Sequence, residues 1–283
     1  MGSDLVLDFR NLKTGTSSFH YSFSFLPKVQ RDALRTVYAF CRTTDDIVDN
    51  SIETTKNIQR LKEWNAELEK AITGQSSYPI LNQLISIAQR YHIPVVHFKN
   101  LIKGVEMDLI KNRYESFDEL KEYCYLVAST VGLMALEIFG PRNEKTRDYA
   151  VNLGIALQMT NILRDVRVDA RFGRIYLPLE DLRRFHCGED VILAGSCTQE
   201  FRALMEFESS RAEEYFRLSQ QSLPPEDRRI MFPATIMERI YYHTLRRIRA
   251  VNYDVFNHSV RVSRGIQFLI AVKYLVKRRL FGM

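Results

Sequence analysis

Near residue 45, an apolar helical pattern gives way to a cluster of charged side chains. The cluster contains Tyr38, Arg42, Asp45, Asp46 and Asp49. Apart from Asp46 they are spaced four, three and four positions apart, so a continuing helix would present them on one face, with Asp46 beside them. Carboxylates one turn apart repel each other, and no Lys or Arg follows within a turn. The cluster is compatible with a solvated helix face or with the binding of a cation.

A second polar stripe lies late in another long helical pattern. It consists of Gln158, Asn161, Asp165 and Asp169, whose spacing of three, four and four also predicts one helix face. The surrounding residues are apolar: Leu153, Ile155, Ala156, Leu157, Ile162 and Leu163. Burying a carboxamide and two carboxylates costs free energy unless they are paired, so this stripe is expected to face a ligand, a metal ion or water.

Taken together, the two acidic faces predict a magnesium site. Their ligands are all oxygens, which suit Mg²⁺, an ion that binds a few carboxylates, retained waters and substrate phosphates. A ferritin-like di-iron centre would need Glu three residues before His on two helices, and no His here has Glu at that offset. A phosphate-binding P-loop and a GxGxxG nucleotide motif are also absent from the sequence.

Mg²⁺ on acidic helices would bind a diphosphate, whose remaining charge nearby arginines could share. The candidates are Arg42, Arg164, Arg171 and Arg174. Such a site fits the ionisation of an allylic diphosphate, in which an apolar, aromatic pocket shelters a carbocation from water. The chain has 14 Tyr and 17 Phe to build such a pocket, although most of these must serve the core.

The elements that carry these stripes are predicted to be helices throughout. Apolar residues recur at intervals of three and four, which predicts an all-α protein with its ligand pocket between helices of one bundle. We expect an N-terminal segment at 1–15 and one helical domain at 16–283. The strongest helical patterns cover 29–43, 55–72, 79–91, 94–112, 117–139, 144–169, 199–222 and 225–250.

Composition narrows the class of protein. With 283 residues, 12 Gly and 8 Pro, the chain is long enough for a large core and too poor in turn residues for a β-sandwich. Lys and Arg exceed Asp and Glu by 40 − 34 = 6, which suits anionic ligands or an anionic membrane surface. Four cysteines without a CxxC pair indicate neither a zinc ribbon nor a disulfide framework, so a cytoplasmic location is expected.

No segment of the sequence is predicted to cross a membrane. The N-terminus lacks the apolar run of a signal peptide, and the longest apolar stretch, Phe268 to Val276, is interrupted by Lys273. The segment from Val272 to Leu280 is basic and amphipathic, as interfacial helices are. It is expected either to touch a membrane peripherally or to pack as a final helix with a solvated basic edge.

Several ordered motifs resemble the squalene/phytoene synthases, an Mg²⁺-dependent family of head-to-head prenyltransferases. The resemblance runs from about Thr16 to Arg264 and implies the all-helical isoprenoid synthase fold with a central cavity. It is carried by TSSFHYSF from Thr16, with Leu26 and Pro27; YAFCRTTDDIVD from Tyr38; YCYLVASTVG from Tyr123; LGIALQMTNILRDVRVD from Leu153; and GRIYLP from Gly173. The segment DRRIMFP from Asp227 resembles the bacterial presqualene diphosphate synthases.

The resemblance implies a role for each matching position. Two or three Mg²⁺ ions would be bound by Asp45 and Asp49 with Asp46 on one wall, and by Asn161, Asp165 and Asp169 on the other. Diphosphate would be held by Ser18, Tyr38, Arg42, Gln158, Arg164, Arg174 and Tyr176. The channel for the isoprenoid chain would be lined by Phe19, Phe23, Tyr123, Val127, Ala128, Val131 and Gly132. Read without the family, Ser18 could cap a helix, Tyr38 could be a core aromatic, and Ala128 with Gly132 could mark a close helix contact.

The function implied is the joining of two farnesyl diphosphates into presqualene diphosphate. The alternatives are phytoene from two geranylgeranyl diphosphates, or dehydrosqualene or squalene from farnesyl substrates. NADPH use, the proton-accepting base, the oligomeric state and the choice between Arg261 and Arg264 as a C-terminal cation stay open. A different class, a catalytically silent helical adaptor at membranes, is disfavoured by the intact aspartates. No nucleic-acid partner is expected.

Overall fold

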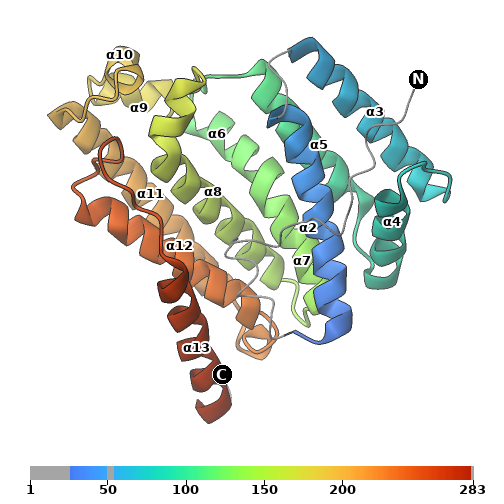
Figure 1. The fold of residues 1–283 in the computed structure, drawn as a ribbon. Helices are drawn as coiled ribbons and strands as arrows, with labels where there is room; N and C mark the ends of the chain where they lie inside the picture. The colour runs from blue at the N-terminus through green and yellow to red at the C-terminus, as the bar shows by residue number, and fades with distance from the viewer. Residues whose placement is uncertain (1–25, 50–53, 282–283) are drawn as a thin grey trace.

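The computed structural model describes residues 26–49 and 54–281, and these form a bundle of helices (Figure 1). In the described part the only sheet-like pairing is an isolated bridge between Arg113 and Ile175, so the all-α prediction is confirmed. The helices are α2 (Lys28–Asp49), α3 (Thr54–Ile72), α4 (Pro79–Tyr91), α5 (Val95–Ile110), α6 (Phe117–Cys124), η2 (Tyr125–Ser129), α7 (Thr130–Phe139), α8 (Thr146–Arg171), α9 (Leu179–Arg184), α10 (Glu189–Leu193), α11 (Gln199–Ser222), η3 (Pro225–Asp227), α12 (Phe232–Ala250) and α13 (Arg264–Phe281).

Helix α8 is the longest element and lies at the centre of the bundle. It packs against α7, η2, α11 and α12, and it runs through the middle of the view in Figure 1. Its apolar positions are buried, from Tyr149 through Ala156 to Val166. The acidic stripe of α8 is therefore carried on a helix that the core holds on several sides.

One continuous helical run, Phe117–Phe139, crosses the core as α6, η2 and α7. A single π-helical turn, η2, interrupts it and widens the run opposite Gly154. A Cβ atom on Gly154 would lie 2.5 Å from Ser129 Cα, so the two backbones are in direct contact there. A Cβ on Gly132 would lie 3.1 Å from the carbonyl oxygen of Ala150. Small residues therefore bring this run and α8 unusually close together.

The same run is the one helix in the described residues that is long and apolar enough to cross a membrane by length and composition. However, 56% of its most apolar 18-residue window is buried inside the protein. A core helix of a folded bundle passes the same test, and this run packs on α5 and α8.

The helix α12 begins later than the sequence predicts. The expected helix over 225–250 is replaced by the short turn η3 and by α12 from Phe232 onward. The cause is Asp227, whose buried carboxylate accepts hydrogen bonds from the backbone N–H groups of Arg142 and Asn143 and from Thr146 Oγ1. These bonds hold the segment in a turn. The short helices α9 and α10 are further additions to the expected set, and the C-terminal helix expected around Val272 to Leu280 is longer and begins at Arg264.

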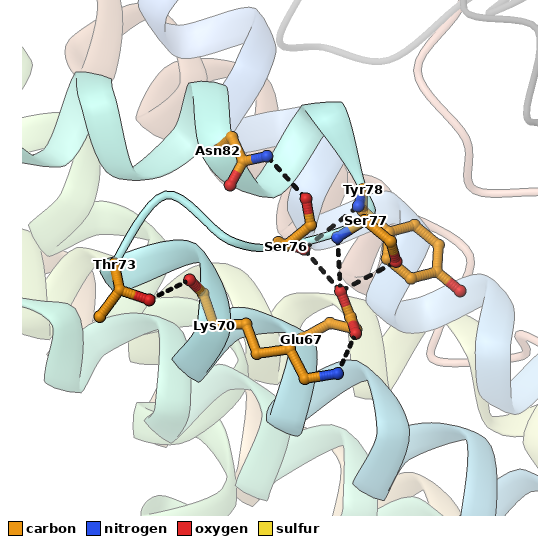
Figure 2. A network of polar contacts seen from close by, with 7 residues as sticks. All are labelled: Glu67, Lys70, Thr73, Ser76, Ser77, Tyr78 and Asn82. Atoms are coloured by element: carbon orange, nitrogen blue, oxygen red, sulfur yellow. Dashed lines mark hydrogen bonds and ion pairs between the residues drawn. The ribbon is translucent and has the colours of Figure 1, made fainter.

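The turn between α3 and α4 is held by one carboxylate, shown in Figure 2. Glu67 accepts hydrogen bonds from Ser76 Oγ at 2.8 Å and from the Ser77 backbone N–H at 2.9 Å, and it pairs with Lys70 at 2.7 Å. The Lys70 ammonium and the serine donors lower the pKa of Glu67 to about 2. The connection between the helices expected at 55–72 and 79–91 is therefore held by specific hydrogen bonds.

Helix α13 extends away from the body of the bundle (Figure 1). It packs mainly on α12, where Ala271 meets a small cluster of Phe232, Ile236 and Ile240.

Candidate functional site

A cavity of about 270 Å³ opens between α2, η2, α7, α8 and α12. Its polar end contains Tyr38, Asp45, Gln158, Asn161 and Tyr241, and the rest of its wall is apolar. Eight of the residues predicted from the sequence lie in this wall: Tyr38, Asp45, Val127, Ala128, Val131, Gly132, Gln158 and Asn161. Gly132 both packs against α8 and lines the cavity, so its two sequence-based interpretations are compatible.

The first acidic wall is the C-terminal part of α2. Asp45 is exposed there, and Asp46 pairs with Arg42 across one turn at 2.7 Å. The sequence argument looked for cations only after the aspartates, whereas the compensating arginine precedes them. Asp49 ends α2, and its side chain lies outside the described residues.

The second acidic wall is the C-terminal half of α8. Arg164 donates two hydrogen bonds to the Asp165 carboxylate. The bond from Nε to Oδ1 is 2.9 Å long. Asn161 Nδ2 donates to Gln158 Oε1 at 3.3 Å, while Asn161 Oδ1 is buried and has no hydrogen-bond partner. Burial, and then the nearby charge of Asp165, raise the pKa of Asp169 to about 7. Burial and the repulsion between the two carboxylates of α8 therefore outweigh the opposing charges of Arg164 and Arg174.

A third acidic group, Asp108 on α5, comes close to this wall. Tyr176 donates a hydrogen bond to Asp108 Oδ1 at 2.7 Å, and Tyr123 donates to Oδ2 at 2.9 Å. The charge of Asp108 also contributes to the raised pKa of Asp169. Tyr123 and Tyr176 were predicted to bind substrate; both are buried, stacked on each other and hydrogen-bonded to this carboxylate.

The turn after α8 brings Arg174 toward the site. Gly173 has a positive φ of 71°, and the Arg174 backbone N–H donates to the Asp169 carbonyl oxygen at 3.0 Å. The positive charge of Arg174 opposes the rise in the pKa of Asp169. The predicted residues Ser18, Phe19 and Phe23 lie outside the described part of the chain.

Tyr241 of α12 is a site residue that the sequence analysis did not select. It lines the cavity beside Tyr38. Burial raises its pKa, while the Arg164 charge and a hydrogen bond with Asn161 oppose that rise. Its only sequence signal is the segment Arg239-Ile-Tyr241, which also resembles the squalene/phytoene synthases.

The donor set fits Mg²⁺. In the part of the chain that the structure describes, no three His, Cys, Asp or Glu side chains are gathered tightly enough to hold an ion by themselves. Mg²⁺ is usually bound by one or two carboxylates together with waters and substrate phosphates, so loosely placed carboxylates suffice. The unpartnered oxygen of Asn161 and the raised pKa of Asp169 both fit an ion at this place.

A comparison with known families decides the class of protein. The sequence pattern of the squalene/phytoene synthases matches residues 12–265. The chain belongs to this family. The chain is a prenyltransferase that condenses prenyl diphosphates head to head. The family uses a divalent metal ion for such substrates.

Similar curated proteins are phytoene synthases. The phytoene synthase of Arthrospira platensis is 36% identical over 258 residues, which cover 87% of this chain and 84% of the relative. The 15-cis-phytoene synthase of Synechococcus elongatus is 35% identical over 257 residues, covering 87% and 83%.

Similar solved structures bear other names within the family. A dehydrosqualene synthase in complex with a ligand has a TM-score of 0.82 and 28% identity, covering 95% of this chain and 94% of that one. A squalene synthase from Alicyclobacillus acidocaldarius has a TM-score of 0.76 and 28% identity, covering 83% and 89%.

Proposed function

We propose that this squalene/phytoene synthase joins two molecules of geranylgeranyl diphosphate and forms phytoene. The observation that carries the proposal is the similarity of 87% of this chain to curated phytoene synthases, and the length of the cavity along α8 is compatible with it. The lining of the cavity runs from Asn161 to Tyr149, 12 residues, or about 18 Å at a helical rise of about 1.5 Å per residue. An extended isoprene unit spans four backbone bonds, about 5 Å, so this length exceeds the about 15 Å of a three-unit chain and falls about 2 Å short of a fully extended four-unit chain, which would therefore lie bent in the cavity. The names of the similar curated proteins support the same substrate.

The acidic end would bind the diphosphates. Mg²⁺ held by Asp45, Asp46 and Asp49 on one side, and by Asn161, Asp165 and Asp169 on the other, would neutralise charge that builds on the leaving group. Arg42 and Arg164, which pair with aspartates in the described structure, can exchange those partners for phosphate oxygens. Arg174, Gln158 and Tyr38 would orient the diphosphate beside them.

The apolar length of the cavity would hold the chains and exclude water. Val127, Ala128, Val131 and Gly132 line one side, and their small size lets a prenyl chain lie close to the helix. When one diphosphate leaves, the allylic cation would be attacked by the C2–C3 double bond of the second substrate, and loss of a proton would close a cyclopropylcarbinyl diphosphate. Departure of the second diphosphate, rearrangement of the cation and loss of a second proton would then give phytoene. Tyr38 and Tyr241 line the cavity, and their aromatic rings would stabilise the positive charge of these cations.

Product analysis tests this proposal. Purified protein is given Mg²⁺ with geranylgeranyl or farnesyl diphosphate, with and without NADPH, and both phosphorylated and neutral products are extracted. Phytoene from geranylgeranyl diphosphate without NADPH is expected. Turnover of farnesyl diphosphate alone would contradict the choice of substrate while leaving the reaction class intact.

The farnesyl reaction, which stops at presqualene diphosphate or continues to dehydrosqualene or squalene, is the second candidate. Likeness to the dehydrosqualene synthase structure over almost the whole of both chains favours it. In the same assay its signature is a product from farnesyl diphosphate, and a dependence on NADPH identifies a reductive second step.

We also propose that α13 places the enzyme on an anionic membrane surface. The helix sequence has five Lys or Arg residues and no Asp or Glu, which complements anionic lipid. Leu269 and Val276 are two turns apart and 64% and 51% exposed, on the side opposite the contact of Ala271 with α12. Each gains about 1.5–3 kcal/mol if fully buried in an apolar phase.

Co-sedimentation with vesicles tests the surface. The wild type is expected to bind vesicles of phosphatidylcholine with phosphatidylglycerol, and less strongly in high salt. The double variant Leu269→Gln with Val276→Gln should lose most of this binding. Val96→Gln, which changes an equally exposed apolar residue on α5, is the matched control. Equal binding by the wild type and the double variant would refute the proposed surface.

A further inference from the structure

The cavity ends at a group of bulky residues at the other end of α8 from the acidic walls. Phe139 ends α7, Tyr149 lies in the first turn of α8, and Met231 directly precedes α12. All three line the cavity, and their side chains are 6%, 0% and 2% exposed. The end of α7, the first turn of α8 and the residue before α12 therefore each contribute a large side chain to the lining.

Hydrogen bonds to Asp227 join the two chain segments next to these residues. Asp227 is fully buried, and its carboxylate accepts hydrogen bonds from the backbone N–H groups of Arg142 and Asn143 at 3.0 and 3.1 Å and from Thr146 Oγ1 at 2.6 Å. The Met231 backbone N–H in turn donates to the Asp227 carbonyl oxygen at 3.0 Å. The loop between α7 and α8 and the connection between α11 and α12 are thus tied together one turn beyond Tyr149.

A second buried polar group fixes the wall on the α12 side. Glu238 is 2% exposed and accepts a hydrogen bond from Gln220 Nε2 at 2.7 Å. The Tyr149 residue is fully buried beside Thr235 and Glu238, and its pKa is raised by burial and then by the charge of Glu238. A ring packed in this way is poorly able to swing aside for a longer chain.

We propose that Phe139, Tyr149 and Met231 form the stop of the prenyl channel, and that Tyr149 sets the longest chain accepted. The proposal rests on the substrate length argued above and assigns a role to the segment from Asp227 to Pro233. Thr146 lies three residues beyond Tyr149, or about 4.5 Å along the helix, which is close to one isoprene unit. Removal of the Tyr149 ring therefore opens room for about one further unit.

Competition between substrates of different length tests the stop. The enzyme receives equal amounts of geranylgeranyl and geranylfarnesyl diphosphate, and the products are counted by mass. Tyr149→Ala is expected to raise the share of the longer substrate about tenfold or more, since a hydrophobic pocket discriminates by about that factor per methylene. The ratio is measured within one sample, so partial unfolding of a variant leaves it unchanged.

A variant with the opposite effect makes the test stricter. Ala135 lines the cavity one turn before Phe139 on α7, and Ala135→Phe should shift preference from geranylgeranyl toward farnesyl diphosphate. Phe216→Ala, which removes a buried ring on α11 that is not part of the cavity lining, should keep the wild-type ratio.

The outcomes separate this proposal from the choice of substrate. If Tyr149→Ala protein still converts geranylgeranyl diphosphate and the ratio of products from the two substrates is unchanged, the proposed stop is wrong. A wild type that converts only farnesyl diphosphate would overturn the geranylgeranyl proposal. The stop would then be supported if Tyr149→Ala gains geranylgeranyl diphosphate as a substrate.

Discussion

Tyr176 donates a hydrogen bond to Asp108 over 2.7 Å, and this bond ties the turn after α8 to the last turn of α5. Tyr123 donates to the other oxygen of the same carboxylate. Asp108 thereby holds two aromatic rings in place and adds negative charge beside Asp169. Helix α5 thus contributes an acidic group to a site that the sequence assigned to two helices.

Replacing Asp108 is expected to impair the reaction without unfolding the protein. Asp108→Asn keeps the shape but removes the charge and one strong acceptor, so we expect turnover to fall by about 10²-fold, comparable to the loss of one positioned electrostatic group. Steady-state rates at fixed Mg²⁺ measure the effect. Asp118→Asn, in the exposed first turn of α6, is the control. Equal rates in the two variants would show that Asp108 is only structural.

Removing one carboxylate from either acidic wall should lower the rate more than Asp108→Asn does. Asp45→Ala and Asp165→Ala each remove a predicted metal ligand rather than a core contact, and each is expected to cost at least about 10³ in rate with the fold intact. Rates and circular dichroism are measured together. Asp148→Ala, on the exposed first turn of α8, should behave as the wild type. Near-normal turnover in either wall variant would contradict a metal site between α2 and α8.

A buried cluster far from the cavity predicts how stability depends on pH. Arg211 donates to Asp181 at 2.8 Å and to Glu208 at 2.7 Å, so two buried carboxylates share one cation. Burial raises the pKa of Glu208 to about 8, with Arg211 opposing the rise and Asp181 adding to it. The folded state therefore holds a proton that the unfolded state releases near pH 4.5.

Because the folded state binds this extra proton, stability falls as the pH rises. The contribution of Glu208 to stability is complete below about pH 4.5 and is lost as the pH rises through about 8. Glu208→Gln, which stays neutral, is expected to make the fall in thermal midpoint between pH 5 and pH 8 shallower. Parallel midpoint curves for the variant and the wild type would show that Glu208 is not protonated in the folded protein.

The contact between η2 and α8 predicts a strong packing effect. Gly154→Ala places a methyl group 2.5 Å from Ser129 Cα, where backbone rather than a flexible side chain would have to move. Such overpacking typically costs about 1–3 kcal/mol of unfolding free energy. Gly265→Ala, in α13 with open space around it, should instead be neutral or stabilising by about 0.5–1 kcal/mol. Denaturant unfolding compares the two.

The sequence predicted the helical fold and both acidic stripes because periodicity records which face of a helix is buried. It did not reveal Asp108, since a single aspartate in an apolar helix has no spacing to mark it and its partners Tyr123 and Tyr176 are distant in the chain. The late start of α12 was missed for a similar reason. Asp227 forms its hydrogen bonds with residues more than 80 positions away, and local pattern carries no information about them.

The backbone contact between Ser129 and Gly154 also bears on how a finished product leaves. Two helices that touch at their backbones cannot part without breaking their packing, so this side wall stays shut during turnover. A long hydrocarbon that has lost its charged end must therefore slide out along the channel axis rather than escape between α7 and α8. We therefore expect release to slow as the product lengthens, so that the exit of the product rather than the bond-forming chemistry limits turnover for the longest chains.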